Sequence, residues 1–221
     1  MPLKYSILVI IFIIFVIFLV RAALTGEKKQ EYILKPLSSI LAIVIALLSC
    51  TDARYNLTYT ILIVTGLLFS LGGDIVLMFE SGKIFVIGLV LFLIAHIAYA
   101  AGFSAFSGFH PRDIFSAIVL LAIAAILFRF LRKGLGNMMI PVLIYITVIN
   151  VMVHRAFSTT ELDFFNLQQA LCISIGAVLF SISDIMLALN RFAKPFKYHR
   201  LNLAFYYAGQ LLIALSTGLY N

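Results

Sequence analysis

The stretch YSILVIIFIIFVIFLVRAAL, residues 5–24, is apolar almost throughout and contains a single charged residue, Arg21. An α-helix needs about 20 mostly apolar residues to cross the ~30 Å hydrocarbon core of a bilayer. The run is too long for the apolar region of a signal peptide and lacks a convincing cleavage site, so we expect a retained membrane helix. This stretch therefore places the chain among membrane proteins.

The same pattern continues along the chain. Hydrophobic residues make up 63% of the 221 residues and charged residues 11%, whereas soluble domains carry roughly a quarter of charged residues. This composition excludes a water-soluble fold, because too few polar side chains exist to cover its surface. We predict an all-α, polytopic transmembrane helix bundle that forms a single transmembrane domain over residues 1–221, with no soluble domain. Its eight predicted spans are residues 5–24, 34–50, 57–79, 84–106, 114–131, 138–157, 166–190 and 201–220.

The basic residues predict the orientation in the membrane. Twelve of the 16 Lys and Arg residues fall on one side of the eight-span arrangement, and four fall on the other: Lys4, Arg54, Arg112 and Arg155. The positive-inside rule then places both termini on the non-cytoplasmic side of the cell inner (cytoplasmic) membrane. The net charge of +7 lies in loops beside apolar runs, so we expect membrane lipids as partners and no nucleic acid. The sequence leaves the oligomeric state open.

The two cysteines and four histidines are too few and too scattered for a disulfide scaffold or a zinc site. We therefore expect no metal site.

The chain also shows a weak internal repeat. Sliding the sequence by 110 residues aligns GLLFSLGGDIVLM at 66–78 with GAVLFSISDIMLA at 176–188 and matches Asp74 with Asp184. The two segments belong to the third and seventh spans, which run in the same direction, so the match suits a parallel 4+4 duplication. Chance agreement between two apolar stretches is the simpler explanation, and the sequence leaves both open.

Asp74 and Asp184 are residues that lipid should exclude. An ionised carboxylate at membrane depth costs at least ~2.5 kcal/mol, so it is a functional candidate. Both lie about 8 to 9 Å inside the predicted cytoplasmic boundary. If the third and seventh spans are neighbours, the two carboxyls face one cavity, and burial with mutual repulsion keeps one protonated while the other stays ionised. Alternatively, each carboxyl pairs with a base or caps a helix and only stabilises the bundle.

Further polar side chains gather at the same predicted level. We expect Lys35 and Arg191 to capture an anionic headgroup, or else to be interface anchors. Tyrosine hydroxyls there can bond to substrate or a carboxyl, or belong to the aromatic belt. His96 lies deeper, as a proton relay or as a neutral histidine bonded to a neighbouring helix. The candidate substrate-binding residues are Lys35, His96, Tyr145, Asn190, Arg191, Tyr206, Tyr207 and Gln210.

Six segments of the chain share the pattern of a known family. They are KPL at 35–37, FSLGGDIVLM at 69–78, AHIAY at 95–99, PVLIY at 141–145, GAVLFSISDIMLALNRF at 176–192 and YYAGQLLIALS at 206–216. Together they resemble the YhhN family of integral membrane proteins, which includes the lysoplasmalogenases. The likeness covers nearly the whole chain from Lys35 to the C-terminus. The first span carries no motif.

The resemblance implies that the chain hydrolyses the vinyl-ether bond of a 1-alkenyl lysophospholipid, giving a fatty aldehyde and a glycerophospho-alcohol, with Asp74 and Asp184 as catalytic groups. Vinyl ethers hydrolyse when the β-carbon is protonated, so one aspartic acid must donate a proton while the other stabilises the cation and activates water. This chemistry needs no cofactor. Ser183 and Arg191 lie near Asp184 in the sequence and favour it as the acid. A proton-coupled transporter of lipids or small molecules, and a lipid-binding protein without turnover, are the alternatives.

Overall fold

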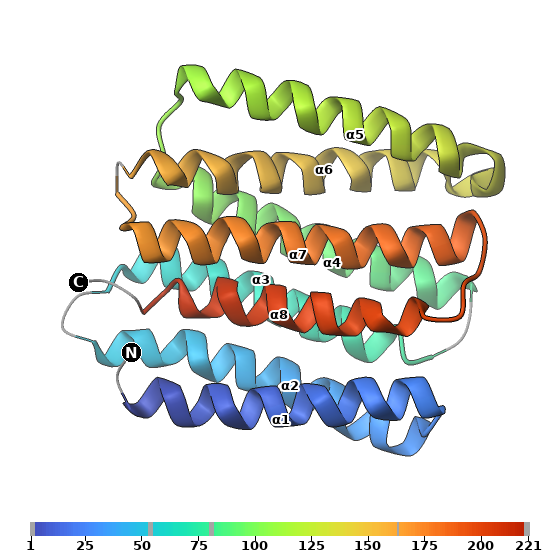
Figure 1. Cartoon of the computed structure of the whole chain (residues 1–221), viewed down its shortest axis with the longest axis horizontal. Helices are drawn as coiled ribbons and strands as arrows, with labels where there is room; N and C mark the ends of the chain where they lie inside the picture. Colours follow the sequence, from blue (N-terminus) through green and yellow to red (C-terminus); the bar gives the residue numbers. More distant parts are fainter. Residues whose placement is uncertain (1–2, 53–54, 80–81, 163, 219–221) are drawn as a thin grey trace.

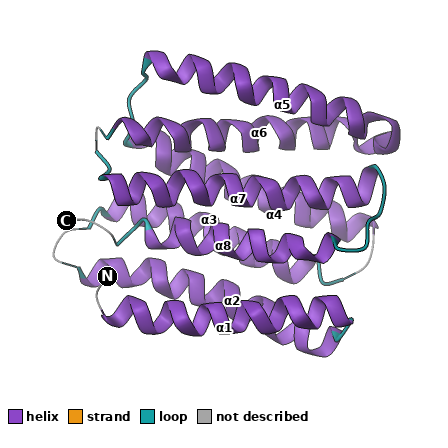
Figure 2. Cartoon of the chain, in the orientation of Figure 1, coloured by secondary structure: helices purple, strands orange, loops and turns teal. Residues whose placement is uncertain are grey.

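The structure is a computed structural model that describes residues 3–52, 55–79, 82–162 and 164–218. Within these ranges it contains eight α-helices and no strand, which confirms the predicted all-α class (Figure 2). The helices are α1 (Leu3–Thr25), α2 (Lys28–Leu47), α3 (Leu57–Val76), α4 (Gly82–Ala105), α5 (Pro111–Leu135), α6 (Met139–Ser158), α7 (Leu167–Phe192) and α8 (Asn202–Leu215). Short 3-10 turns cover Leu48–Thr51, Gly136–Met138, Thr159–Glu161 and His199–Leu201.

Six segments of the described chain are long and apolar enough to cross a membrane. One of them, Pro111–Glu161, contains both α5 and α6, and the 14-residue α8 is not among the six. The chain is therefore a multi-pass membrane protein, while the count of eight crossings stays a prediction. Arg54 and the end of the last predicted window, residues 219–220, lie outside the described residues.

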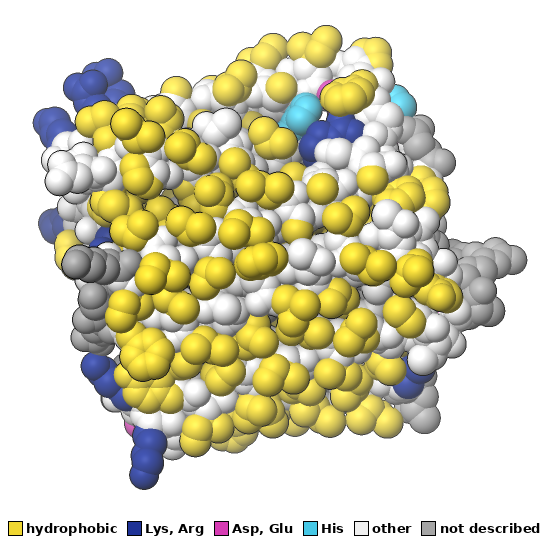
Figure 3. Space-filling view, turned by 180° about the vertical axis from the view of Figure 1, so that it is seen from behind, with side chains coloured by type: hydrophobic (Ala, Val, Ile, Leu, Met, Phe, Trp, Pro, Cys, Tyr) yellow, Lys and Arg dark blue, Asp and Glu magenta, His cyan; other side chains and the backbone are white. Residues whose placement is uncertain are grey.

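The lipid-facing character is visible on the surface. On the face shown in Figure 3, hydrophobic side chains cover the middle of the bundle and Lys and Arg lie towards its two ends. Large apolar side chains such as Ile17, Phe115 and Leu121 are more than half exposed. A soluble monomer rarely exposes apolar surface on this scale, so lipid is the solvent that suits this face.

α3 and α7 begin at capping residues that are 110 positions apart. The Asn56 side chain accepts a hydrogen bond from the Tyr59 amide at 2.8 Å, and the Asn166 side chain accepts one from the Gln169 amide at 3.0 Å. Side-chain oxygens at this position satisfy the first free N–H groups of a helix and so fix its start. The spacing equals the offset at which the two aspartate segments align.

Six helices form a ring around the interior of the bundle. In the order α2, α3, α4, α6, α7, α8 each helix packs against the next, and α8 closes the ring on α2. α1 lies outside it against α2 and α8, and α5 lies outside against α6 and α7 (Figure 1). α3 and α7 thus occupy opposite places in the ring. They are not the direct neighbours that the sequence left open, and the interior of the ring lies between them.

The contact between α7 and α8 depends on two glycines. A Cβ atom built on Gly209 would lie 2.7 Å from the carbonyl oxygen of Gly176 and 2.9 Å from the amide nitrogen of Phe180. Small residues allow helix backbones to approach this closely. The contact holds α8, which carries Tyr206, against α7, which carries Asp184.

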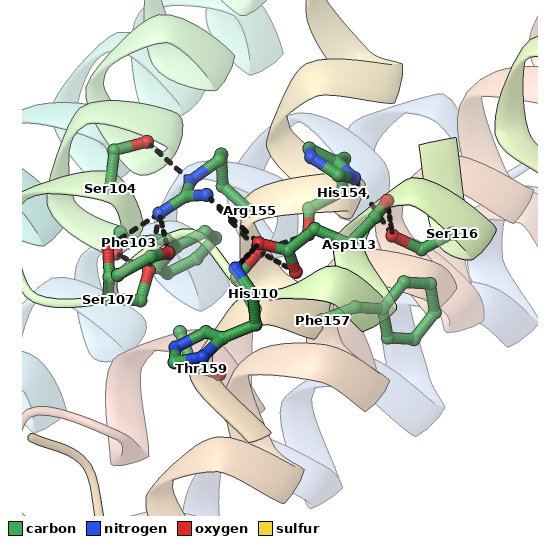
Figure 4. Close-up of polar contacts among 12 residues, drawn as sticks. Phe103, Ser104, Ser107, His110, Asp113, Ser116, His154, Arg155, Phe157 and Thr159 are labelled. Atoms are coloured by element: carbon green, nitrogen blue, oxygen red, sulfur yellow. Dashed lines mark hydrogen bonds and ion pairs between the residues drawn. The ribbon is translucent and has the colours of Figure 1, made fainter. Parts of the chain in front are cut away.

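A buried ion pair between Arg155 and Asp113 lies at the end of the bundle where α4 is connected to α5 (Figure 4). Arg155 of α6 donates to the carbonyl oxygens of Ser107 at 2.6 Å and Gly108 at 3.0 Å, in the connection between α4 and α5. Asp113, 3.8 Å from the guanidinium, accepts from Ser158 Oγ at 2.7 Å. Because these charges are matched by partners within the protein, we assign this cluster a structural role.

Candidate active site

Asp74 lies near the end of α3 with its side chain 2% exposed. Its Oδ2 atom accepts hydrogen bonds from the hydroxyls of Ser39 at 2.6 Å, Tyr206 at 2.7 Å and Tyr207 at 3.3 Å. The Nζ atom of Lys35 lies 3.5 Å from Oδ1. All of these partners come from α2, which adjoins α3 in the ring, and from α8, which follows on the other side of α2. A carboxyl group surrounded by hydroxyl donors and an ammonium group is arranged as an acceptor.

Asp184 lies in α7 with its side chain 14% exposed. Its Oδ2 atom accepts one hydrogen bond, from the Tyr145 hydroxyl at 2.6 Å, and lies 3.5 Å from Nε2 of the buried His96. The other ring nitrogen, Nδ1, lies 2.5 Å from the carbonyl oxygen of Phe92. A carbonyl oxygen only accepts, so Nδ1 carries a hydrogen and Nε2 of a neutral ring is an acceptor. The carboxyl group and the imidazole can therefore share one proton.

Both aspartates line one cavity of about 450 Å³, near the connections between α3 and α4 and between α7 and α8. Its wall combines the two carboxyls with cationic and amide side chains. The other polar residues that line it are Lys35, Ser183, Asn190, Arg191, His199, Arg200, Asn202 and Tyr206. This composition suits an anionic group held close to two carboxyls.

A narrow apolar cleft of about 50 Å³ begins at Asp184. Leu77, Phe85, Phe92 and Leu187 line both the cleft and the larger cavity, and Asp184 is the one polar residue common to the two sets of described residues. Asp184 therefore lies where a polar space meets an apolar one. An amphiphile bound across this junction would place the bond between its head and its tail beside this carboxyl.

The structure places the candidate residues from the sequence in different parts of the site. Lys35, Asn190, Arg191 and Tyr206 line the cavity with the two aspartates. Tyr145 lines the apolar cleft, and His96 lies behind Asp184 with no exposed surface. The Arg191 guanidinium lies 4.5 Å from the ring centre of Phe85, so it stacks on the cavity wall.

Tyr207 and Gln210 lie behind the cavity, and neither is among the described residues that line it. The Tyr207 hydroxyl shares its one hydrogen between Asp74 and the carbonyl oxygen of Lys35, which is the shorter contact at 2.9 Å. Gln210 donates to the Tyr206 hydroxyl at 2.7 Å. Both side chains are buried. They therefore hold Lys35 and Tyr206 in place, where the sequence suggested direct contact with substrate.

Three site residues escaped the sequence analysis. Ser39 lies one helical turn after Lys35, and this i, i+4 spacing on one helix face was the available signal. His199 and Arg200 belong to the turn before α8, and Arg200 pairs with Glu31 at 3.1 Å. A turn between two apolar helices gives no periodic pattern, so the sequence carried no signal for these two.

Comparisons with known proteins place the chain in a family. The model of the YhhN family matches residues 30–217. The proteins named lysoplasmalogenase TMEM86A of Bos taurus and Homo sapiens are 33% and 34% identical over 157 residues, which cover 70% of this chain and 64% of each relative. A lysoplasmalogenase homolog of Dictyostelium discoideum is 27% identical over 233 residues, 83% of this chain and 76% of that protein. No solved structure matches. The chain thus spans 64% of the length of the two mammalian relatives.

Proposed function

The chain belongs to the YhhN family, and from this premise we propose that it is a lysoplasmalogenase that hydrolyses the vinyl-ether bond of 1-alkenyl lysophospholipids with ethanolamine or choline headgroups. Relatives with the name lysoplasmalogenase support the reaction class. The observation that carries the proposal is the single cavity that both aspartates line, with its apolar continuation at Asp184.

In this proposal the headgroup phosphate binds in the polar cavity. Lys35, Arg191 and Arg200 supply positive charge there, and Asn190 supplies an amide. The vinyl ether lies at the junction beside Asp184, and the hydrocarbon chain enters the apolar cleft. Phosphate binding at Lys35 would also draw that ammonium group away from Asp74 and leave the Asp74 carboxylate free for chemistry.

Asp184 is proposed as the general acid. A neutral His96 presents an acceptor nitrogen to its carboxyl group, so the proton belongs on the carboxyl group. Transfer of this proton to the β-carbon of the vinyl ether gives an oxocarbenium ion. The Asp74 carboxylate stabilises the cation and takes a proton from the attacking water, which gives a hemiacetal.

Collapse of the hemiacetal completes the cycle. Its hydroxyl proton returns to Asp184, and the proton held by Asp74 passes to the departing glycerol oxygen. One water molecule is consumed, and the products are a fatty aldehyde and a glycerophospho-alcohol. The reaction as written uses only protons and water, so we propose no cofactor.

We also propose that all eight helices belong to one membrane domain with both termini on the non-cytoplasmic side of the inner membrane, as the positive-inside rule predicts. A 4+4 duplication gains support from the site itself. The 110-residue offset pairs Lys35 with Tyr145, Asp74 with Asp184, and His96 with Tyr206. Lys35 of α2 and Tyr206 of α8 contact Asp74, and Tyr145 of α6 and His96 of α4 contact Asp184. The offset thus relates the contacts of one aspartate to those of the other.

Aldehyde release from 1-alkenyl lysophosphatidylethanolamine or lysophosphatidylcholine by the purified protein tests the proposal. In D2O the aldehyde should carry one deuterium on the carbon next to the carbonyl, because that carbon receives the proton. Asp74→Asn and Asp184→Asn should lose this release, whereas Glu161→Gln, at the other end of the bundle, should keep it. A carrier or a lipid-binding protein would release no aldehyde, and that result, or full release by both aspartate variants, would overturn the proposal.

A further inference from the structure

A long apolar groove runs between α5, α6 and α7 and has no part in the mechanism above. Its volume is about 550 Å³, and none of the described residues that line it is charged. It shares five lining residues with the narrow cleft at Asp184. They are Leu127 of α5, Ile146 and Ile149 of α6, and Ser181 and Ile185 of α7. The polar cavity, the cleft and the groove therefore adjoin one another in series, and we take this series as the path of a ligand.

The groove is long enough for one lipid tail. On α5 its wall extends from Phe115 to Leu127, which corresponds to about 18 Å along the helix axis at ~1.5 Å per residue. The hydrocarbon of one leaflet is about 15 Å deep, half of a ~30 Å core. A single chain that follows this wall would thus reach from the cleft to its end.

The polar side chains in the groove are mostly engaged elsewhere. Asn150 donates to the carbonyl oxygen of Ile146 at 2.7 Å, and Ser116 donates to that of Asp113 at 2.9 Å. These two side chains already have hydrogen-bond partners within their own helix, so they do not require a polar ligand. The path is therefore cationic and polar at one end and apolar along the rest of its length, which complements an amphiphile with one anionic head and one tail.

We infer that this groove holds the hydrocarbon tail of the lysolipid and that the α5 wall sets the chain length the protein accepts. The inference rests on the proposed function, because the proposed headgroup site fixes where the tail begins. Lipid tails are as apolar as the groove, so transfer from the bilayer gains little free energy. Selection then comes from steric fit, and a bulky side chain in the groove should exclude long chains.

Ala124 and Ala125 offer a matched pair for the test. Ala124 lines the groove, whereas its neighbour Ala125 is exposed on α5 and does not line it. Ala124→Phe should lower kcat/KM for a chain of about 16 carbons at least ~10-fold more than for one of about 8 carbons. Ala125→Phe should leave the ratio of the two at the wild-type value. Val119→Phe lies about 7.5 Å further along the wall and should exclude only the longest chains. Equal ratios in all three variants would overturn the inference.

A binding measurement keeps the test independent of catalysis. The chain contains no tryptophan, so Ala124→Trp and Ala125→Trp each create a single fluorophore. The probe is a 1-alkyl lysophospholipid, whose saturated ether is not hydrolysed, with a brominated chain that quenches tryptophan. In lipid nanodiscs, quenching of A124W should saturate at low probe fraction and be relieved by unbrominated 1-alkyl lysophospholipid. Quenching of A125W should only follow the probe fraction in the lipid.

The two failures are distinguishable. Absence of aldehyde from the wild-type protein, with saturable quenching of A124W, would reject the enzyme and keep the groove as a tail site. Aldehyde release with identical quenching of the two tryptophan variants would keep the enzyme and reject the groove.

Discussion

Asp74 and Asp184 occupy equivalent places in α3 and α7, yet their surroundings differ in every partner. Asp74 has an ammonium group at 3.5 Å and three hydroxyl donors. Asp184 has one hydroxyl donor and a ring nitrogen that is itself an acceptor when the imidazole is neutral. The first environment suits a carboxylate and the second suits a carboxylic acid. One cavity can therefore hold the two protonation states that vinyl-ether hydrolysis requires.

The 110-residue offset also pairs the partners of the two aspartates. Lys35 beside Asp74 corresponds to Tyr145 beside Asp184, and Tyr206 beside Asp74 corresponds to His96 beside Asp184. An ammonium group is thus exchanged for a neutral phenol, and a phenol donor for an imidazole. The hydroxyls of Ser39 and Tyr207 have no polar counterpart, because the same offset pairs these residues with Ile149 and Ile97. All four differences leave Asp184 with fewer donors than Asp74.

The largest expected effect is on the acid. Asp184→Asn removes the proton donor while keeping the shape of the side chain, so aldehyde release should fall about 10³-fold. Asp184→Glu keeps the donor and should retain part of the rate. Initial rates with 1-alkenyl lysophospholipid measure both variants. An Asp184→Asn protein with wild-type rates would remove Asp184 from the mechanism.

Asp74→Asn should lower the rate by about 10²-fold, because the cation and the attacking water lose their carboxylate. It should also destabilise the protein, by about 3 kcal/mol, since it leaves the buried Lys35 without its counter-ion. The double variant Lys35→Met with Asp74→Asn should recover stability and not activity. Thermal unfolding in detergent checks this, and an Asp74→Asn protein as stable as the wild type would contradict the assigned ion pair.

The rate should depend on pH in a bell shape. Activity falls at low pH as Asp74 takes up a proton and at high pH as Asp184 loses its own, by about tenfold per pH unit on each side. The limbs belong to the coupled pair and to His96, which shares the proton of Asp184. A profile measured from well below to well above neutrality tests this, and a flat profile would not fit two carboxyls in different states.

The smallest effects concern the hydroxyl donors. Tyr145→Phe removes the one hydroxyl bonded to Asp184 and should slow the reaction about fivefold. Tyr206→Phe leaves Ser39 and Tyr207 on Asp74, so its effect should be smaller, roughly twofold. Comparison of kcat in the two variants measures the difference. A larger loss of kcat in Tyr206→Phe would indicate that Asp74 depends more on its tyrosine donor than Asp184 does.

Much of the fold followed from the sequence, because long apolar runs can only be helices in lipid. The two aspartates were also predictable, since charge at membrane depth is costly. The sequence could not show which helices adjoin, and α3 and α7 proved to lie across the ring from one another. The sequence also could not show the direction of individual side chains. Gln210 was expected at the substrate, and its side chain donates to the Tyr206 hydroxyl instead. His199 and Arg200 lie in a turn, where no periodicity marks a site.

The proposed mechanism requires that Asp184 carry a proton at neutral pH and that Asp74 be ionised. Infrared spectroscopy of the protein in lipid measures this directly, because un-ionised carboxylic acids have a carbonyl stretch separate from that of carboxylates. At neutral pH we expect one buried carboxylic acid band that disappears in Asp184→Asn and remains in Asp74→Asn. Loss of the band in Asp74→Asn alone, or absence of such a band from the wild-type protein, would contradict it.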